Sequence, residues 1–160
     1  ALAIVVQEGR NFGPQDFARY HPGGDLGRRL MRVGELMRRG DRNPIVRSGV
    51  SLLETIGVMT RTPGRPGATS VVDSGDRLVG FFTDGDLRRL LESAAVTDLR
   101  SQRIDDVMTR NPRAISPDTF AIEALASLHN FRVDQLPVVA ADGRLVGLLD
   151  VQDLLDLRIG

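Results

Sequence analysis

The stretch LVGFFTDGDL at residues 78–87 recurs as LVGLLDVQDL at residues 145–154. Upstream of these two stretches, VGELM at residues 33–37 is matched by IDDVM at residues 104–108. Matching segments that follow in the same order indicate an internal repeat. The sequence therefore predicts two copies of one structural unit, each about 60 residues long.

The two copies share a local pattern that predicts their secondary structure. A short apolar stretch, at residues 44–46 and again at 112–115, is followed by an amphipathic run that is typical of a helix. Two apolar runs separated by a turn come next, and a second helix is expected to begin near Asp84 and near Asp150. The predicted order in each copy is strand, helix, strand, strand, helix.

Cap and turn residues support this order. Ser51 with Glu54 fits a capping box at the start of the first helix, and Thr119 with the more distant Glu123 fits one less well. Asp142-Gly143 lies between two apolar runs, and this pair is a strong signal for a hairpin turn.

These patterns predict an α/β (α+β) fold made of two pseudo-symmetric repeats. We expect repeat 1 to span residues 33–96 and repeat 2 to span residues 97–160. A single repeat would leave one face of its small sheet uncovered, so the repeats should pack as a pair about a pseudo-twofold axis. Each repeat is expected to give a three-stranded sheet with helices on one side.

The composition narrows the classes of function. Hydrophobic residues make up 41% of the 160 residues, and the 21 basic side chains balance the 21 acidic ones. A net charge of zero argues against a dedicated nucleic-acid-binding protein, which normally carries a basic excess. The absence of cysteine excludes disulfides and thiolate metal sites, and no apolar run is long enough to span a membrane.

Residues 1–32 have no counterpart elsewhere in the chain, so they are expected to belong to a different unit. The first eight residues, ALAIVVQE, lack the basic start and the cleavage site of a signal peptide. They begin without Met and resemble the middle of a protein. We therefore expect a cytoplasmic chain that is part of a longer protein.

The candidate binding residues lie where the second apolar run of repeat 1 passes into a helix. Thr83 offers a hydroxyl, Asp86 a carboxylate that can accept from two ribose hydroxyls, and the helix start its free amides for a phosphate. Gly80 would let the backbone approach a ligand closely. A purely structural explanation competes with this one, because Thr and Asp at a helix start are ordinary caps.

The pattern Gly-hydrophobic-x-Thr-x-x-Asp, which Gly80, Thr83 and Asp86 fill here, resembles the ribose-phosphate motif of CBS (cystathionine-β-synthase) domains. The resemblance covers residues 33–157. The opening FARYHPGGDLGRRL at residues 17–30 is similar to the segment that joins a sugar isomerase (SIS) domain to the CBS pair in arabinose-5-phosphate isomerases. The stretch FFTDGDLRR at the start of the second helix in repeat 1 also resembles that family.

The resemblance implies a set of site residues in repeat 1. Asp86 would hold the ribose and Thr83 would lie near the phosphate, and the neighbouring Asp84 is included among the binding residues. The base would lie between the apolar side chains of Ile45, Val46 and Val71.

The second copy departs from the motif. Asp150 replaces the Thr, although Asp153 remains, and an ionised carboxylate at that position would repel a phosphate. This departure argues against a functional site in repeat 2. Arg88 and Arg89 follow on the helix of repeat 1, where a solvated helix face explains them better than a contact with an anion.

The resemblance also gives a role to His21. In the isomerases the His of His-Pro-Gly-Gly contributes to an active site, and an imidazole suits proton transfer in an aldose-ketose isomerisation. We expect His21 to act only in a full-length enzyme, because the chain itself lacks a phosphate-binding loop and paired catalytic carboxylates. His129 is expected to be structural or solvent-facing, and no spacing suggests a metal site.

Two hypotheses for the function remain from the sequence. In the first, the CBS pair senses a nucleotide or nucleotide-sugar for an attached SIS catalytic domain that converts ribulose 5-phosphate to arabinose 5-phosphate. A cytidine nucleotide-sugar is the favoured effector, ahead of an adenine nucleotide, because the pathway that the resemblance implies, toward lipopolysaccharide, makes a cytidine-activated sugar. In the second, the module binds nothing and only holds subunits together. Either hypothesis predicts a homo-oligomer, a dimer or a tetramer.

Overall fold

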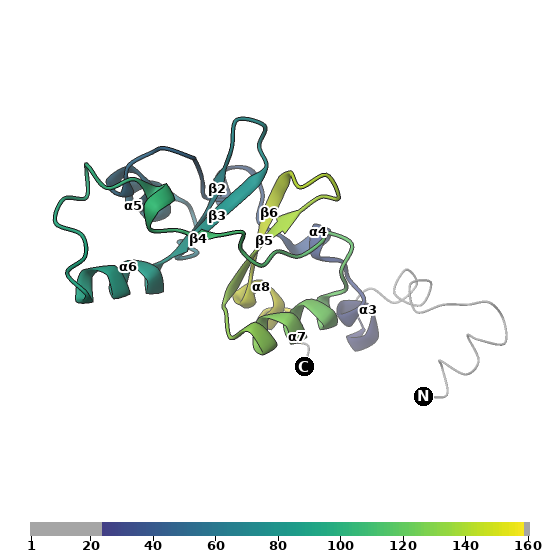
Figure 1. The fold of residues 1–160 in the computed structure, drawn as a ribbon. Helices are drawn as coiled ribbons and strands as arrows, with labels where there is room; N and C mark the ends of the chain where they lie inside the picture. Colours follow the sequence, from purple (N-terminus) through teal and green to yellow (C-terminus); the bar gives the residue numbers. More distant parts are fainter. Residues whose placement is uncertain (1–23, 159–160) are drawn as a thin grey trace.

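The computed structural model describes residues 24–158 of the chain (Figure 1). Two short helices come first, α3 (Asp25–Arg29) and α4 (Val33–Leu36), followed by the 3-10 turn η1 (Gly40–Arg42). Repeat 1 continues with β1 (Ile45–Arg47), α5 (Leu52–Arg61), β2 (Ala68–Val72), β3 (Leu78–Thr83) and α6 (Asp84–Glu92). Repeat 2 contains η2 (Ile104–Asp106), β4 (Thr109–Arg110), α7 (Ala121–Phe131), β5 (Gln135–Val139), β6 (Leu145–Asp150) and α8 (Val151–Leu155).

The predicted element order is present in repeat 1, and repeat 2 follows it from its first helix onward. The first sheet has the order β1-β2-β3-β4, with β1 parallel to β2 and the other pairs antiparallel. The second sheet is the antiparallel pair β5-β6. The tips of the two hairpins lie side by side, joined by a hydrogen bond from the Leu78 amide to the Gly143 carbonyl (3.2 Å) (Figure 1).

The strand predicted at residues 112–115 is only partly formed. Ile115 alone pairs with Val138 in parallel, in the place that Val46 takes beside Val71 in repeat 1. The strand β4 precedes this stretch and pairs with β3 of repeat 1. The expected pair of three-stranded sheets is thus corrected to one four-stranded sheet and one two-stranded sheet extended by isolated bridges.

Each repeat begins with a short segment that packs on the sheet of the other repeat. We call residues 33–39 the first leading segment and residues 104–110 the second. Arg38 forms an antiparallel bridge with Leu148 of β6, while Thr109 pairs with Phe81 of β3. The packing units are therefore interlocked, and neither sequence repeat forms its core alone.

The hydrophobic clusters confirm this exchange. Val33 packs with side chains of repeat 2 such as Leu128 and Leu149, whereas Ile104 packs with side chains of repeat 1 such as Leu52 and Phe82. A third, small cluster joins the repeats through Ala68, Phe81 and Leu148. Strand alternation explains the division, because neighbouring residues of β3 face opposite sides of the sheet. Phe82 faces the helices of repeat 1, and Phe81 faces repeat 2.

Most of the local signals have the predicted role. The Ser51 hydroxyl accepts a hydrogen bond from the Glu54 amide (3.1 Å) at the start of α5. The start of α7 differs by one residue, because the amide of Phe120 rather than Thr119 donates to the Glu123 carboxylate (3.4 Å). The Asp142-Gly143 turn is present, with Gly143 at a φ of 87° that favours glycine.

Candidate functional site: a cleft between the repeats

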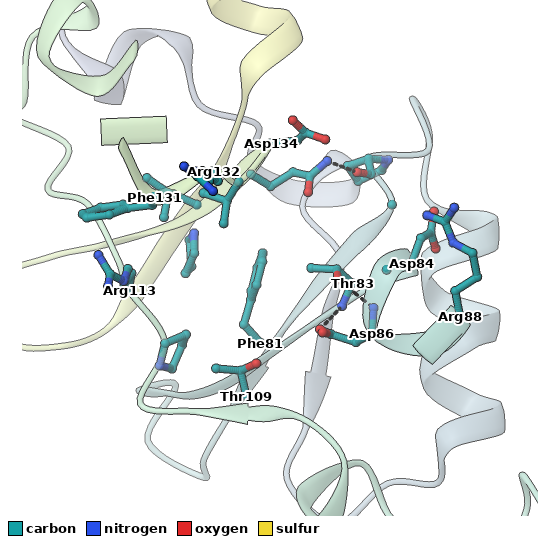
Figure 2. A pocket seen from close by; sticks show the side chains of 18 of the residues that line it. Phe81, Thr83, Asp84, Asp86, Arg88, Thr109, Arg113, Phe131, Arg132 and Asp134 are labelled. Carbon is teal, nitrogen blue, oxygen red and sulfur yellow. Dashed lines mark hydrogen bonds between the residues drawn. The ribbon is translucent and has the colours of Figure 1, made fainter. Parts of the chain in front are cut away.

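The candidate site is a cleft of about 730 Å³ between the two repeats. Repeat 1 contributes the loop before β2, the end of β3 and the first turn of α6. Repeat 2 contributes the end of α7, the start of β5 and the segment after β4 (Figure 2). Because both repeats form its walls, a ligand in this cleft would be sensitive to their relative position.

The structure places Thr83, Asp84 and Asp86 in this cleft, where β3 passes into α6. Asp86 accepts a hydrogen bond from the Thr83 amide (2.9 Å), and its own amide donates to the Thr83 hydroxyl (3.2 Å). This reciprocal pair is a capping box that orients the carboxylate. The other carboxylate oxygen of Asp86 contacts the Arg89 guanidinium at 2.5 Å.

The lining of the cleft favours an anion. It contains five arginines and three aspartates, a net charge of +2; the arginines are Arg65, Arg88, Arg89, Arg113 and Arg132. Within residues 24–158, Asp86 and Arg89 form the one ion pair that involves any of these arginines and aspartates. A phosphate entering the cleft would therefore meet guanidinium groups that are not already paired with a carboxylate.

Aromatic and apolar side chains form the rest of the lining. Phe81 stands between the start of α6 and the residues of repeat 2, and Phe131 lies on the opposite side (Figure 2). The Arg113 guanidinium lies 4.1 Å from the centre of the Phe131 ring, a cation–π contact. An apolar surface beside several arginines is suited to a ligand that combines a planar ring with a negatively charged group.

Four residues that the sequence assigned to the site lie elsewhere. Val46 and Val71 are 4% and 0% exposed in the core under α5 and α6, so their side chains are not available to a ligand in the cleft. Ile45 is exposed, but it does not line the cleft. Gly80 faces Met108, whose Cγ would lie 2.8 Å from an added Cβ, so its small size admits that side chain.

Sequence reasoning missed the contributions of repeat 2 to the cleft, among them Arg113, Phe131 and Gln135. Gln135 donates a hydrogen bond to the Pro66 carbonyl (2.7 Å) and so joins the two walls. These residues lie outside the repeated motif, and only the packing of one repeat on the other brings them to Thr83. Of the two phenylalanines that line the cleft, only Phe81 belongs to the motif, so the sequence could have indicated Phe81 but not Phe131.

The remaining candidates fall outside the cleft. His21 lies outside the described residues. His129 is exposed near the end of α7, in agreement with the solvent-facing prediction. In residues 24–158 no cluster of three His, Asp or Glu side chains could hold a metal ion, and no helix of that part is long and apolar enough to cross a membrane.

The sequence matches the model of the CBS domain twice, over residues 33–93 and 104–160. The chain belongs to the CBS-domain family. Each match includes one of the two leading segments, and the Thr83–Asp86 turn lies inside the first match.

Several curated relatives carry the same enzyme name. Arabinose 5-phosphate isomerase KdsD of Pseudomonas aeruginosa is 44% identical over 97% of this chain and 47% of its own length. The Escherichia coli K12 protein of the same name is 39% identical over 97% of this chain and 46% of its own. These relatives confirm the resemblance to the isomerases, and the chain spans about half their length.

Solved CBS pairs share the fold. CBSX2, a CBS-pair protein from Arabidopsis thaliana, has been solved in complex with AMP; it is 24% identical, with a TM-score of 0.66 over 79% of this chain and 95% of its own. A CBS domain pair in complex with 5′-methylthioadenosine and S-adenosyl-L-methionine is 20% identical, with a TM-score of 0.70 over 81% of this chain and 96% of its own.

Proposed function

We propose that this chain is the nucleotide-sensing module of an arabinose 5-phosphate isomerase, and that its effector binds in the cleft between the repeats. The observation that carries the proposal is the oriented carboxylate of Asp86 inside a cleft of net positive charge. The similarity to KdsD supports the parent enzyme, and the nucleotide complexes of solved CBS pairs support the class of ligand.

Each part of a nucleotide has a counterpart in the cleft. The Asp86 carboxylate, held by the Thr83 amide, would accept from the ribose hydroxyls once Arg89 moves aside. Arg89 is 70% exposed, so this movement costs little. The phosphate would lie near Thr83 and the unpaired arginines, and the base against Phe81.

The effector that we favour remains a cytidine nucleotide-sugar, ahead of an adenine nucleotide. This preference follows the pathway that the similarity to KdsD implies. Calorimetry of the 160-residue chain with AMP and with a CMP-activated sugar tests both the site and the preference. Stronger binding of AMP would reverse the preference and leave the site in place.

Asp86→Ala should weaken binding, because the ribose loses hydrogen bonds to a charged group that contribute about 1.5–3 kcal/mol. The expected loss of affinity is roughly 10- to 150-fold. Glu92→Gln is the matched control, since it removes one exposed carboxylate from the other end of the same helix. Equal affinity of Asp86→Ala and the wild type would remove Asp86 from the site.

The second hypothesis, a scaffold without a ligand, is favoured by the capping box. Thr83 and Asp86 already bond each other, as ordinary cap residues do. On that hypothesis calorimetry detects neither nucleotide, and Asp86→Ala changes only stability.

We also propose association of the chain with itself and with a catalytic domain. Leu53, Leu91 and Leu155, on α5, α6 and α8, are 41%, 56% and 51% exposed and offer apolar surface to a second copy. Light scattering that finds a monomer at micromolar concentration would contradict self-association.

His21 would serve the catalytic domain, and a cytoplasmic location stays a prediction.

A further inference from the structure

The two repeats can be aligned residue by residue, because the strand pairs β2-β3 and β5-β6 have the same register. Thr83 pairs with Ala68 and Asp150 with Gln135, so Asp150 is the counterpart of Thr83, and Asp153 that of Asp86. The backbone repeats as well: the Asp84 amide donates to Gly67 (2.9 Å), and the Val151 amide donates to Asp134 (2.7 Å).

The leading segments complete this correspondence. Thr109 pairs with Phe81, and Arg38 pairs with Leu148, which is the counterpart of Phe81. We call Thr83, Asp86, Arg89 and Thr109 site 1; their counterparts Asp150, Asp153, Asp156 and Arg38 are site 2. An exposed Thr109 beside site 1 is thus replaced by a buried arginine beside site 2.

Arg38 binds both carboxylates of site 2. Its Nε and Nη2 lie 3.0 and 3.2 Å from the two oxygens of Asp153, in a bidentate pair. Its Nη2 also lies 3.9 Å from Asp150. The Arg38 side chain is 8% exposed, and those of Asp150 and Asp153 are 10% and 17% exposed.

The guanidinium that contacts the aspartate comes from a different element in each site. In site 1 the partner of Asp86 is Arg89, on the same helix and 70% exposed. In site 2 the counterpart of Arg89 is Asp156, so α8 supplies no cation, and the guanidinium comes from the first leading segment instead.

We propose that Arg38 is a built-in occupant of site 2, which closes this site to nucleotides and limits the chain to one nucleotide per molecule. For the ligand class, the proposal rests on the proposed function. A ribose would have to displace a buried, bidentate guanidinium from Asp153, and this displacement is far less favourable than moving an exposed one. A phosphate would meet the Asp150 carboxylate where site 1 offers the Thr83 hydroxyl.

The proposal predicts that the side chains of site 1 open site 2 when they are transplanted. The variant combines Arg38→Thr, Asp150→Thr and Asp156→Arg. Calorimetry with AMP and with CMP should give one binding event per wild-type chain and two per variant chain. A variant that gains no event over the wild type overturns the proposal, and so does a wild-type chain that binds two nucleotides.

The same experiment separates this inference from the proposed function. A wild-type chain that binds none and a variant that binds one would reject the nucleotide role of site 1 and keep the occlusion of site 2. If the triple variant does not fold, as judged by its thermal melt, Asp86→Ala in the otherwise unchanged chain decides. It should lose at least 10-fold in affinity and retain no second event, whereas residual binding abolished by Asp153→Asn would place a nucleotide in site 2.

Discussion

Site 1 and site 2 hold an aspartate at the same position of the same motif, yet the two carboxylates have different partners. Asp86 contacts Arg89, which is mostly exposed and three residues away on α6. Asp153 contacts Arg38, which is buried and 115 residues away in the sequence. The repeat conserves the carboxylate, whereas its availability depends on the leading segment that reaches it.

The comparison shows how one fold can present an open and a closed version of one site. The exchange of leading segments places one residue of each segment beside the motif of the opposite repeat. A threonine at that position leaves the motif accessible, and an arginine neutralises it. We therefore expect changes at residues 38 and 109 to alter the accessibility of the two carboxylates.

The largest expected effect comes from removing the buried cation. Arg38→Ala leaves the buried Asp150 and the largely buried Asp153 without a cationic partner, and breaking a buried pair in this way costs about 3–5 kcal/mol. Urea denaturation should show this loss in the free energy of unfolding. Arg89→Ala in site 1 is the matched control and should cost no more than about 0.5 kcal/mol, because the pair is exposed. Similar losses in the two variants would remove the contrast between the sites.

The close approach of each leading segment to the opposite sheet predicts the next effect. In Gly147→Ala the new Cβ would lie 2.6 Å from Met37 Sδ and 2.9 Å from the Arg38 carbonyl oxygen, which the bridge to Leu148 holds in place. We expect a loss of about 2–3 kcal/mol from overpacking.

Gly80→Ala sharpens this comparison, because the three atoms nearest to its new Cβ all belong to the flexible Met108 side chain, whereas the Cβ of Gly147→Ala also meets backbone. The loss should be smaller, about 1–2 kcal/mol. Thermal or urea unfolding of both variants measures the difference. A larger loss for Gly80→Ala would show that the second leading segment is held more rigidly than the first.

The smallest effect concerns a contact that only the second leading segment makes. Burial raises the pKa of Asp105, but hydrogen bonds from the Ser48 hydroxyl and the Gly49 amide outweigh it and lower the pKa below its ordinary value of 3.8. The bonds therefore stabilise the fold above that pH, and the contribution disappears as the pH falls through the folded-state pKa.

Asp105→Asn should lower the free energy of unfolding at pH 7 by about 0.5–1 kcal/mol, an amount kept small by solvent screening. The difference from the wild type should shrink as the solution is acidified. Urea titrations at several pH values measure it, with Asp106→Asn as a neighbouring control. A difference that does not change with pH would mean that the carboxylate charge has no part in the contact.

The sequence by itself determined the repeat, the element order and the position of Thr83 and Asp86 at a helix start. These features depend on local periodicity and on turn and cap chemistry, which act within a few residues: Ser51 caps α5, and Asp142-Gly143 forms a turn. Val46 and Val71 show the limit of such reasoning, since an apolar residue near a motif is equally suited to a site and to a core.

Only the tertiary structure decided which repeat each leading segment completes and which side chains share the cleft. Arg38 lies near the start of repeat 1 but neutralises Asp153 of repeat 2, and Phe131 lies across the cleft from Thr83. Nothing near Arg38 in the sequence indicates its partner, because the pairing follows from a β-bridge across two interlocked sheets. The physical reason is that burial and pairing of charge are properties of the assembled interior, where residues far apart in the chain share one low-dielectric site.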